Sequence, residues 1–352
     1  MNSNSANPVL SGPCNLVTGA LGFVGLHLVR SLALAGLPVV GVGRHGPDQP
    51  LPARAGEFQL AGPSTDLPDA VRYTGPSGDF IYLPMALENP RPVADLVNRL
   101  RPSMVFHLAA QSSAAVSFRD PADTFTSNVS GTLNLLEAVR RVPETERPVM
   151  LSVGSAEEYG PQPNVGKPIR EDAPLYPISP YGVSKAAQTM LCRQYAATWD
   201  LPIILVRSFS HTGPGQDSRF AFPSFARQIA AAEVGKGPSE ISVGDLSAAR
   251  DFLDVRDVVD AYRLLLKEGH PGEIYNVCSG SSLTIRQGLE MLLDEATVEI
   301  NLKTDPDLCR PSDIPFLVGD NTKIKRDSAW EPQYELKQTL SGVLSTSRKE
   351  FS

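Results

Sequence analysis

Cysteine is scarce in this chain of 352 residues, and long apolar runs are missing. No segment approaches the roughly 18 consecutive apolar residues of a membrane span, so we expect no membrane partner. The opening segment MNSNSANPVLSGPC has neither a basic stretch nor an apolar core, and it predicts no secretion signal. The cysteines are scattered without CxxC spacing, which predicts neither a disulfide framework nor a zinc site and favours a reducing, cytoplasmic compartment; they are Cys14, Cys192, Cys278 and Cys309.

Positive charge is also in deficit. Lysine and arginine total 32 against 39 aspartate and glutamate residues, so the formal net charge is −7. A chain with this balance has no strong positive field to attract nucleic acid or anionic lipid, and we expect neither as a partner. Hydrophobic residues make up 41% and charged residues 20%, an ordinary balance that argues against global disorder. The length corresponds to two units, or to one large α/β domain with an appended cap.

Strand-like and helix-like segments alternate after a polar N-terminal stretch. Short apolar runs predict buried strands at residues 15–18, 38–42, 104–108, 148–153 and 203–206. Helical periodicity predicts helices at residues 23–34, 93–100, 125–142 and 180–200. This alternation predicts an α/β fold with a Rossmann-type doubly wound parallel sheet. Residues 44–78 are rich in proline and glycine, and their pattern gives no assignment.

The rhythm changes beyond about residue 208. Helices are predicted near residues 223–233, 256–267 and 285–295, with short strands between them. We therefore expect a smaller, mixed α/β C-terminal domain, some of whose elements return to the main sheet. The predicted organisation is a disordered tail at 1–12, a main domain at 13–207 and a cap at 208–352.

A glycine-rich turn, TGALGFVG at residues 18–25, joins the first predicted strand to the first predicted helix. One glycine permits the tight turn, one lets the backbone approach a pyrophosphate, and one lets the helix pack closely on the sheet. The N–H groups and the positive dipole at the helix start then bind the anion. A glycine-rich turn without a ligand is the plain alternative, but the strand–turn–helix context favours dinucleotide binding.

The end of the second predicted strand indicates the cofactor preference. NAD sites place a carboxylate there to bind the ribose 2′-hydroxyl, whereas this segment carries Arg44, and the first acid is Asp48. A guanidinium can pair bidentately with a 2′-phosphate, so Arg44 favours NADP, with NAD possible. The alternative is that Arg44 is a solvated loop residue.

A proton-handling cluster is predicted at the carboxyl ends of the strands, where ligands bind in open α/β sheets. Tyr181 and Lys185 are four residues apart on one face of a predicted helix, and a nearby ammonium lowers the pKa of a tyrosine. Ser155 follows the strand predicted at 148–153 and could donate a hydrogen bond to a substrate carbonyl beside Tyr181. Glu157 either adds a carboxylate to the same pocket or is a surface acid.

These segments resemble the extended short-chain dehydrogenase/reductase family of nucleotide-sugar enzymes. The resemblance extends from about residue 14 to residue 345, and it includes TGxxGxxG, HLAAQ at 107–111, the Ser155 segment and YxxxK. Later segments are most similar to the GDP-6-deoxy-D-mannose reductase branch of that family; they are HTGPGQ at 211–216, GDLSAARDF at 244–252, YNVCSG at 275–280, RPSDIP at 310–315 and GDNTK at 319–323.

The resemblance implies reduction of the C4 ketone of GDP-4-keto-6-deoxy-D-mannose to GDP-6-deoxy-D-mannose (GDP-D-rhamnose), with NADPH preferred and NADH possible. It implies four catalytic residues, with Tyr181 as the general acid: Ser155, Glu157, Tyr181 and Lys185. The implied cofactor-binding residues are Gly19, Leu21, Gly22, Phe23, Val24, Gly25, Arg44, Leu108, Ala109, Ala110, Tyr181, Lys185 and Ser208. The implied substrate-binding residues are Gln111, Ser155, Glu157, Ser210, Phe222, Arg227, Arg250 and Arg310. No metal is implied, and a homodimer through the helices at 125–142 and 180–200 is expected.

Three departures from the family pattern bear on selectivity. The pair Ala86-Leu87 replaces an Asp-Leu pair that touches the adenine, Ser210 replaces an asparagine near the substrate, and the spacing of 44–78 differs. Two alternatives therefore stay open. One is a GDP-mannose 4,6-dehydratase, or another nucleotide-sugar epimerase or dehydratase, that uses Glu157. The other is a non-catalytic, cofactor-sensing protein on the same scaffold.

Overall fold

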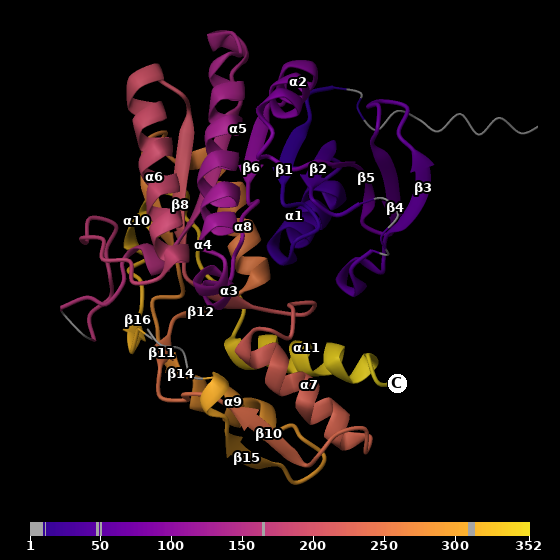
Figure 1. Cartoon of the computed structure of the whole chain (residues 1–352), viewed down its shortest axis with the longest axis vertical. Helices are drawn as coiled ribbons and strands as arrows, with labels where there is room; N and C mark the ends of the chain where they lie inside the picture. Colours follow the sequence, from indigo (N-terminus) through magenta and orange to yellow (C-terminus); the bar gives the residue numbers. More distant parts are fainter. Residues whose placement is uncertain (1–9, 11, 47–48, 50, 164–165, 309–313) are drawn as a thin grey trace, which may run out of the picture.

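The large sheet dominates the computed structural model, which describes residues 10, 12–46, 49, 51–163, 166–308 and 314–352 (Figure 1). Its strands are β1 (Asn15–Thr18), β2 (Val39–Gly43), β3 (Gln59–Pro63), β4 (Val71–Gly75), β5 (Gly78–Pro84), β6 (Met104–His107), β7 (Val149–Ser155), β8 (Ile203–Ser208) and β13 (Ile274–Val277). Within the described residues these nine strands have the order β13-β8-β7-β6-β1-β2-β5-β4-β3. Neighbours from β13 to β5 are parallel, which confirms the predicted α/β fold with a Rossmann-type sheet.

The register brings the carboxyl ends of the central strands to one edge of the sheet. Thr18, the last residue of β1, lies opposite Val42 of β2 and His107 of β6. Ser155 and Ser208, the last residues of β7 and β8, are paired with each other. The segments that follow these strands therefore meet along this carboxyl edge.

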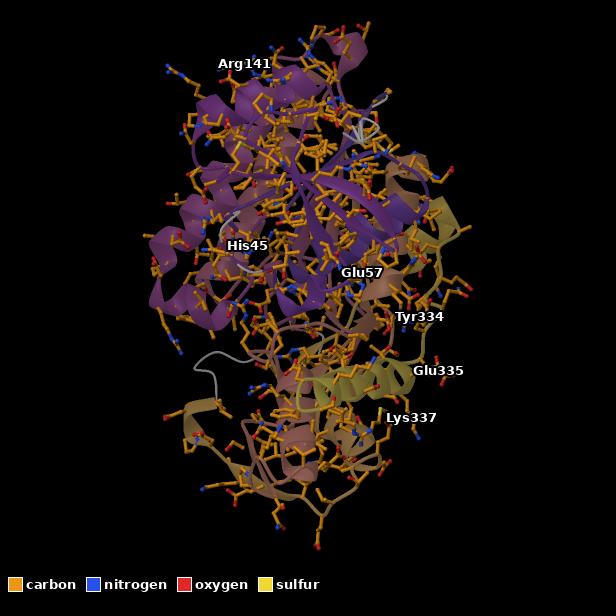
Figure 2. All side chains as sticks on the ribbon, turned by 90° about the vertical axis from the view of Figure 1, so that its right-hand side faces the viewer. His45, Glu57, Arg141, Tyr334, Glu335 and Lys337 are labelled. Atoms are coloured by element: carbon orange, nitrogen blue, oxygen red, sulfur yellow. The ribbon has the colours of Figure 1, made fainter. Side chains whose placement is uncertain are left out.

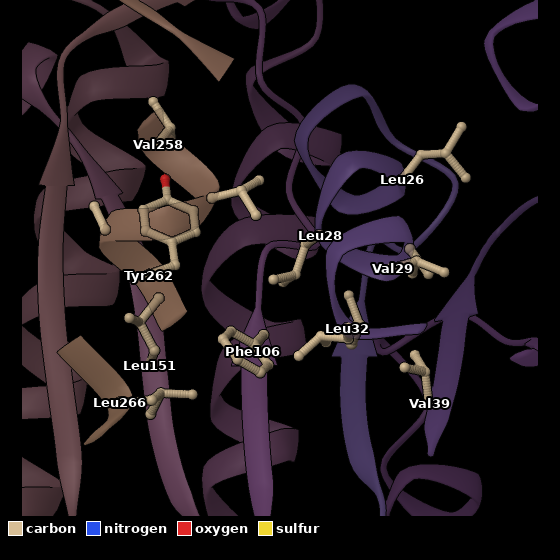
Figure 3. Packing of buried hydrophobic residues seen from close by; sticks show 14 of the residues in the cluster. Leu26, Leu28, Val29, Leu32, Val39, Phe106, Leu151, Val258, Tyr262 and Leu266 are labelled. Carbon is tan, nitrogen blue, oxygen red and sulfur yellow. The ribbon is translucent and has the colours of Figure 1, made fainter. Parts of the chain in front are cut away.

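One face of the sheet is covered by α1 (Phe23–Leu34) and α8 (Val255–Glu268), which also contact each other. Figure 3 shows their buried side chains together with Phe106 and Leu151 of the sheet. Full burial of a leucine stabilises a fold by about 1.5–3 kcal/mol, so this apolar layer fixes α1 against the sheet. Helix α1 has the bounds predicted from its periodicity, and Gly36, with a φ of +69°, follows its end.

The opposite face is covered by α2 (Pro90–Leu100), α5 (Gly131–Arg140) and α6 (Pro180–Trp199), whose apolar side chains share a second core with the sheet. The helix predicted over 125–142 is wrong at its start, because a π-helical turn (Thr126–Ser130) precedes α5. Two short helices, α3 (Ala114–Arg119) and α4 (Pro121–Phe125), lead into that turn.

The stretch 44–78, which has no assignment from its pattern, extends the sheet. It contains a 3₁₀ turn (Ala53–Ala55), β3, β4 and the start of β5. Strand β4 pairs antiparallel with both β3 and β5, and four of the five residues of β3 are exposed. The parallel sheet therefore ends in an antiparallel edge.

A smaller lobe lies beyond the carboxyl edge (Figure 1). Its apolar core includes side chains of α7 (Ala221–Glu233), α9 (Ile285–Leu293), α11 (Leu336–Lys349) and β10 (Glu240–Val243), which pairs with β15 (Asn301–Thr304). Short strands connect the lobe to the sheet edge: β9 (Ser210–Thr212) with β12 (Phe252–Asp254), and β14 (Leu283–Thr284) with β11 (Ala249–Arg250) and β16 (Phe316–Leu317).

The chain crosses between the two lobes more than once. Both α8 and β13 follow residue 208 in the sequence, yet they belong to the large sheet and its helical layer, as does α10 (Thr322–Ser328), which packs on them. Figure 2 shows Tyr334 and Glu335 where the chain returns from this layer to α11. Across the described part of the chain, every helix is too short or too polar to span a membrane.

Candidate active site

The glycine-rich turn after β1 has a backbone that side chains would obstruct. Gly19 has a φ of +72°, and a Cβ on it would lie 3.0 Å from the backbone of Ala109. A Cβ on Gly25 would lie 2.1 Å from the carbonyl oxygen of Gly19. The N-cap of α1 is Gly22, which has no side chain to satisfy the first N–H groups of the helix. The turn therefore fits an anionic phosphate group.

Arg54 adds positive charge beside this turn. Its Nε donates to the carbonyl of Leu21 at 3.3 Å, and its Cβ lies 2.9 Å from the position of a Cβ on Gly215. The side chain of Arg54 therefore begins beside the HTGPGQ loop and places its guanidinium at the glycine-rich turn. That loop packs on α1, because the ring of His211 stacks on Phe23 with centroids 6.2 Å apart.

Ser155, at the end of β7, is buried and has a fixed environment. Its hydroxyl oxygen accepts from the backbone N–H of Glu157 at 3.1 Å, and its own N–H donates to the Glu158 carboxylate at 2.9 Å. Glu157 is half-buried, and its carboxylate accepts from the hydroxyl of Ser179 at 2.9 Å. Since Ser179 caps α6, Glu157 is tied to the helix that carries Tyr181.

Tyr181 lies in the first turn of α6, where its backbone N–H donates to the Ser117 hydroxyl at 3.0 Å. Burial and the Glu157 carboxylate raise the pKa of Tyr181, while a hydrogen bond with the Ser155 hydroxyl lowers it. The net direction is upward, which is opposite to the expected lowering by Lys185. Burial dominates here, and the phenol is a protonated donor at neutral pH.

Lys185 is buried below Tyr181 on the same helix. Its Nζ donates to the carbonyl of Val153 at 2.8 Å and to the side-chain oxygen of Gln188 at 2.9 Å. Burial lowers the pKa of Lys185 to about 8, and the Glu158 carboxylate opposes that shift. The structure thus brings Ser155, Tyr181 and Lys185 together where β7 meets α6.

A buried ion pair lies behind this cluster. The Glu158 carboxylate accepts from Arg207 Nε at 2.9 Å and from the Thr189 hydroxyl at 3.0 Å, and the side chains of Glu158 and Arg207 are 0% and 3% exposed. The guanidinium also lies 4.6 Å from the ring centroid of Tyr159. Because Glu158 also accepts from the Ser155 N–H, the pair holds the end of β7 in place.

Asn128 connects the segment after β6 to α6. Its amide oxygen accepts from the Gln111 N–H at 2.7 Å, and its amide nitrogen donates to the Ser184 hydroxyl at 2.9 Å. It lies in the π-helical turn before α5, and such turns are frequent at functional sites. The Gln111 side chain bonds locally to Ser113 and Thr124.

Other residues at the carboxyl edge come from β2 and β6. Leu108 and Ala109 donate their N–H groups to the Thr18 hydroxyl, each at 3.1 Å, beside the glycine-rich turn. Arg44 follows β2, and its guanidinium pairs with the Glu88 carboxylate and the Ser127 hydroxyl. The Arg44 side chain is 53% exposed, so it is a solvated surface residue whose guanidinium has acidic partners.

Ser208, predicted for the cofactor, is buried at the end of β8, and its hydroxyl lies 2.8 Å from that of Tyr262.

The residues predicted for the substrate are more scattered. Ser210 is half-buried in β9, and Arg250, also half-buried, donates to the carbonyl of Ala249 at 3.0 Å.

Two further predicted residues lie on α7, away from the Ser155–Tyr181–Lys185 cluster. Phe222 packs in the core of the smaller lobe, 4.6 Å from Phe252 by ring centroids. Arg227 pairs with Glu350 at 3.4 Å. Arg310 lies outside the described residues.

Sequence reasoning missed four residues that support the site: Arg54, Asn128, Glu158 and Gln188. Gln188 had a usable signal, because it lies three residues after Lys185 and therefore on the same helix face. Glu158 had an indirect signal. Arg207 is a charged residue directly after the apolar run 203–206, and a buried arginine requires an acidic partner. Asn128 and Arg54 gave no local signal.

The fold and the site together define a Rossmann-type α/β protein with a phosphate-binding turn beside a Ser–Tyr–Lys cluster. The family model described as GDP-mannose 4,6 dehydratase matches residues 16–343, and the chain belongs to this family. The predicted resemblance to the extended short-chain dehydrogenases/reductases is confirmed.

Individual relatives span nearly the whole chain. The chain is 36% identical over 329 residues to the GDP-6-deoxy-D-mannose reductase of Pseudomonas aeruginosa, covering 94% of this chain and 95% of that protein. It is 29% identical over 353 residues to the dTDP-glucose 4,6-dehydratase of Xanthomonas campestris, covering 93% and 90%. The solved structure of RMD from Pseudomonas aeruginosa complexed with NADPH matches with a TM-score of 0.75 at 33% identity, covering 96% of this chain and 99% of that chain.

Proposed function

We propose that this protein reduces the C4 ketone of GDP-4-keto-6-deoxy-D-mannose to GDP-6-deoxy-D-mannose, with NADPH preferred and NADH possible. The observation that carries the proposal is the convergence of Ser155 at the end of β7 with Tyr181 and Lys185 on α6, which hydrogen bonds of Glu157 and Lys185 hold together, at the sheet edge that bears the glycine-rich turn. The 36% identity to a GDP-6-deoxy-D-mannose reductase supports this substrate over other nucleotide sugars.

In this proposal, residues 13–207 bind the cofactor and residues 208–352 supply the substrate-binding cap. Residues along the carboxyl edge hold the dinucleotide: Gly19, Leu21, Gly22, Phe23, Val24, Gly25, Arg44, Leu108, Ala109, Ala110, Tyr181, Lys185 and Ser208. When bound, the reduced nicotinamide supplies the hydride that C4 receives. Arg54, beside the turn, adds a cation that favours the pyrophosphate.

The protein's own residues supply the proton that the C4 oxygen receives. Tyr181 donates its hydroxyl proton to the C4 oxygen as the carbonyl becomes an alcohol, and its raised pKa keeps that proton available at neutral pH. Ser155 donates a hydrogen bond to the same oxygen and orients the ketone. The Lys185 ammonium favours the tyrosinate that forms, which then regains a proton from solvent.

The substrate's nucleotide is bound from the cap side. Two guanidiniums, those of Arg250 and Arg310, suit a diphosphate. Gln111, Ser210 and Arg227 complete the proposed contacts, with Glu157 and Ser155 at the sugar. Phe222, whose side chain is buried in the core of the smaller lobe, supports α7 beneath them.

One assay tests the function. Purified protein is offered GDP-4-keto-6-deoxy-D-mannose with NADPH or NADH, and separately GDP-mannose alone. Net cofactor oxidation with the keto sugar, accompanied by GDP-6-deoxy-D-mannose in the product, is the expected result. Absence of cofactor oxidation with the keto sugar would overturn the proposal.

A GDP-mannose 4,6-dehydratase is the second candidate, and one observation favours it. The Glu157 carboxylate is half-buried, is tied to α6 through Ser179, and is close enough to Tyr181 to raise its pKa. A carboxylate in that position could remove a proton from the sugar. Conversion of GDP-mannose without net cofactor use would establish this activity instead.

We also propose a cytoplasmic homodimer. Leu133 on α5, together with Val183 and Met190 on α6, forms an exposed apolar set on the outer surface of these helices. Cys14, Cys192 and Cys278 are free thiols, the form that a reducing compartment maintains. Light scattering of the wild type and of Met190→Glu tests the dimer, which the added charge should dissociate.

A further inference from the structure

Arg44 is surrounded by acids at the end of β2. Its guanidinium donates to the Glu88 carboxylate and to the Ser127 hydroxyl, and an oxygen of Asp123 lies 3.7 Å away. Two carboxylates around one guanidinium leave an excess of one negative charge. An arginine in this setting is a weaker partner for a phosphate dianion than an arginine without acidic neighbours.

The pair lies where the adenosine half of a dinucleotide would be bound. Strands β2 and β5 are neighbours, and the N–H of Met85, just after β5, donates to the carbonyl of Gly43 at 2.8 Å. The glycine-rich turn is anchored to the same strand, because the N–H of Gly19 donates to the carbonyl of Val42 at 2.8 Å. In Figure 2, His45, which follows Arg44, lies on the part of the sheet-bearing lobe nearer the smaller lobe.

One carboxylate oxygen of Glu88 is shielded from solvent. Oε2 of Glu88 is buried and has no hydrogen-bond partner among the residues that the structure describes. Burial limits the screening of this charge by water. The Glu88 carboxylate therefore repels a ribose 2′-phosphate, whereas an uncharged 2′-hydroxyl is not repelled.

We propose that Glu88 determines how strongly this protein distinguishes a ribose 2′-phosphate from a 2′-hydroxyl. Its carboxylate pairs with Arg44 and weakens the attraction for the phosphate, and it imposes no such penalty on the uncharged hydroxyl. The Arg44–Glu88 pair thereby allows the same site to bind either NAD(H) or NADP(H). This inference rests on the proposed function, because it needs a dinucleotide on the carboxyl edge.

Two nucleotide fragments test the inference without turnover. Adenosine 2′,5′-bisphosphate and 5′-AMP are titrated by calorimetry into the wild type, Glu88→Gln and Arg44→Gln. In Glu88→Gln we expect the affinity for the bisphosphate relative to 5′-AMP to rise about tenfold, because one repulsive charge is removed and Arg44 is released. In Arg44→Gln the same ratio should fall below that of the wild type.

The matched control is Glu146→Gln, which removes the same charge from an exposed pair with Arg101 (3.1 Å) at the opposite edge of the sheet. Its affinity ratio should equal that of the wild type. A Glu88→Gln ratio that equals the wild-type ratio overturns the inference. If neither fragment binds the wild type, the cofactor site of the proposed function fails as well, which is a distinguishable result.

Discussion

Polar side chains lie at both ends of the carboxyl edge, but the two ends hold them differently. At the end formed by β7 and α6, the side chains of Glu158 and Arg207 are 0% and 3% exposed. At the end formed by β2 and α4, the side chains of Arg44 and Asp123 are 53% and 46% exposed. One end is a buried hydrogen-bonded network, and the other is a group of solvated charges.

This difference in burial means that the geometry of the catalytic residues and the selectivity for the cofactor depend on different parts of the edge. Removing one partner of a buried ion pair typically costs 3–5 kcal/mol, whereas exposed pairs are worth about 0–1 kcal/mol. The buried end therefore fixes the position of Ser155 relative to Tyr181. The exposed end can change its charges at little cost in stability, so cofactor preference can vary while the reaction geometry stays constant.

The buried end should show the largest effect, in the variant Tyr181→Phe. We expect the reduction rate to fall by about 10²–10⁴-fold, because the ring and its packing remain while the proton donor is lost. Binding of adenosine 2′,5′-bisphosphate should change by less than about twofold, since that fragment does not reach the phenol. A reduction rate within tenfold of the wild-type rate would contradict the role of Tyr181 as proton donor. If neither the wild type nor Tyr181→Phe reduces the keto sugar while both bind the fragment, the cofactor-sensing alternative is favoured.

The ion pair behind the site gives the next effect, in the variant Glu158→Leu. Arg207 would be left buried without its carboxylate partner, so we expect the free energy of unfolding to fall by about 3–5 kcal/mol in urea titrations. The matched control is Glu146→Leu, whose partner Arg101 is exposed and whose cost should be about 1 kcal/mol or less. Equal losses in the two variants would show that burial does not make the Glu158–Arg207 pair costlier to break than an exposed ion pair.

The fold could be predicted from the sequence wherever one periodicity ran unbroken. Helix α1 was predicted with its observed bounds because a buried strand, a glycine-rich turn and an apolar stripe occur in succession. Strands β3 and β4 were not, because they form an antiparallel edge with mixed polarity and exposed residues. The start of α5 was misplaced because a π-helical turn keeps a helix-like pattern in the sequence.

The site could be predicted only where its residues are close in sequence. Tyr181 and Lys185 share a helix turn, and Ser155 is at a strand end, so each carried a local signal. Glu158 and Arg207 are 49 residues apart, and Arg44 and Glu88 are 44 apart. Such pairs are set by strand order in the sheet, which a single sequence does not specify.

An intermediate effect should appear in the pH dependence of kcat/KM for the reduction. The native pKa of Lys185 is lowered to about 8, so its ammonium is lost above that pH and the rate should fall about tenfold per pH unit. The Glu158 carboxylate raises the pKa of Lys185, so Glu158→Gln should move the fall to lower pH. A profile flat from pH 7 to 9.5 would contradict a requirement for the ammonium.

The smallest effect is expected at the exposed end, in the variant Asp123→Asn. Asp123 lies 3.7 Å from Arg44 with both side chains about half exposed, so water and salt screen much of its repulsion of a 2′-phosphate. We expect the affinity for adenosine 2′,5′-bisphosphate relative to 5′-AMP to rise by less than about threefold at 0.15 M salt, and by more at 0.01 M. Because Glu88 touches the guanidinium directly and has a buried oxygen, its variant should exceed this effect at both salt concentrations. An Asp123→Asn effect equal to that of Glu88→Gln would mean that summed charge, not the placement of one carboxylate, governs the choice of cofactor.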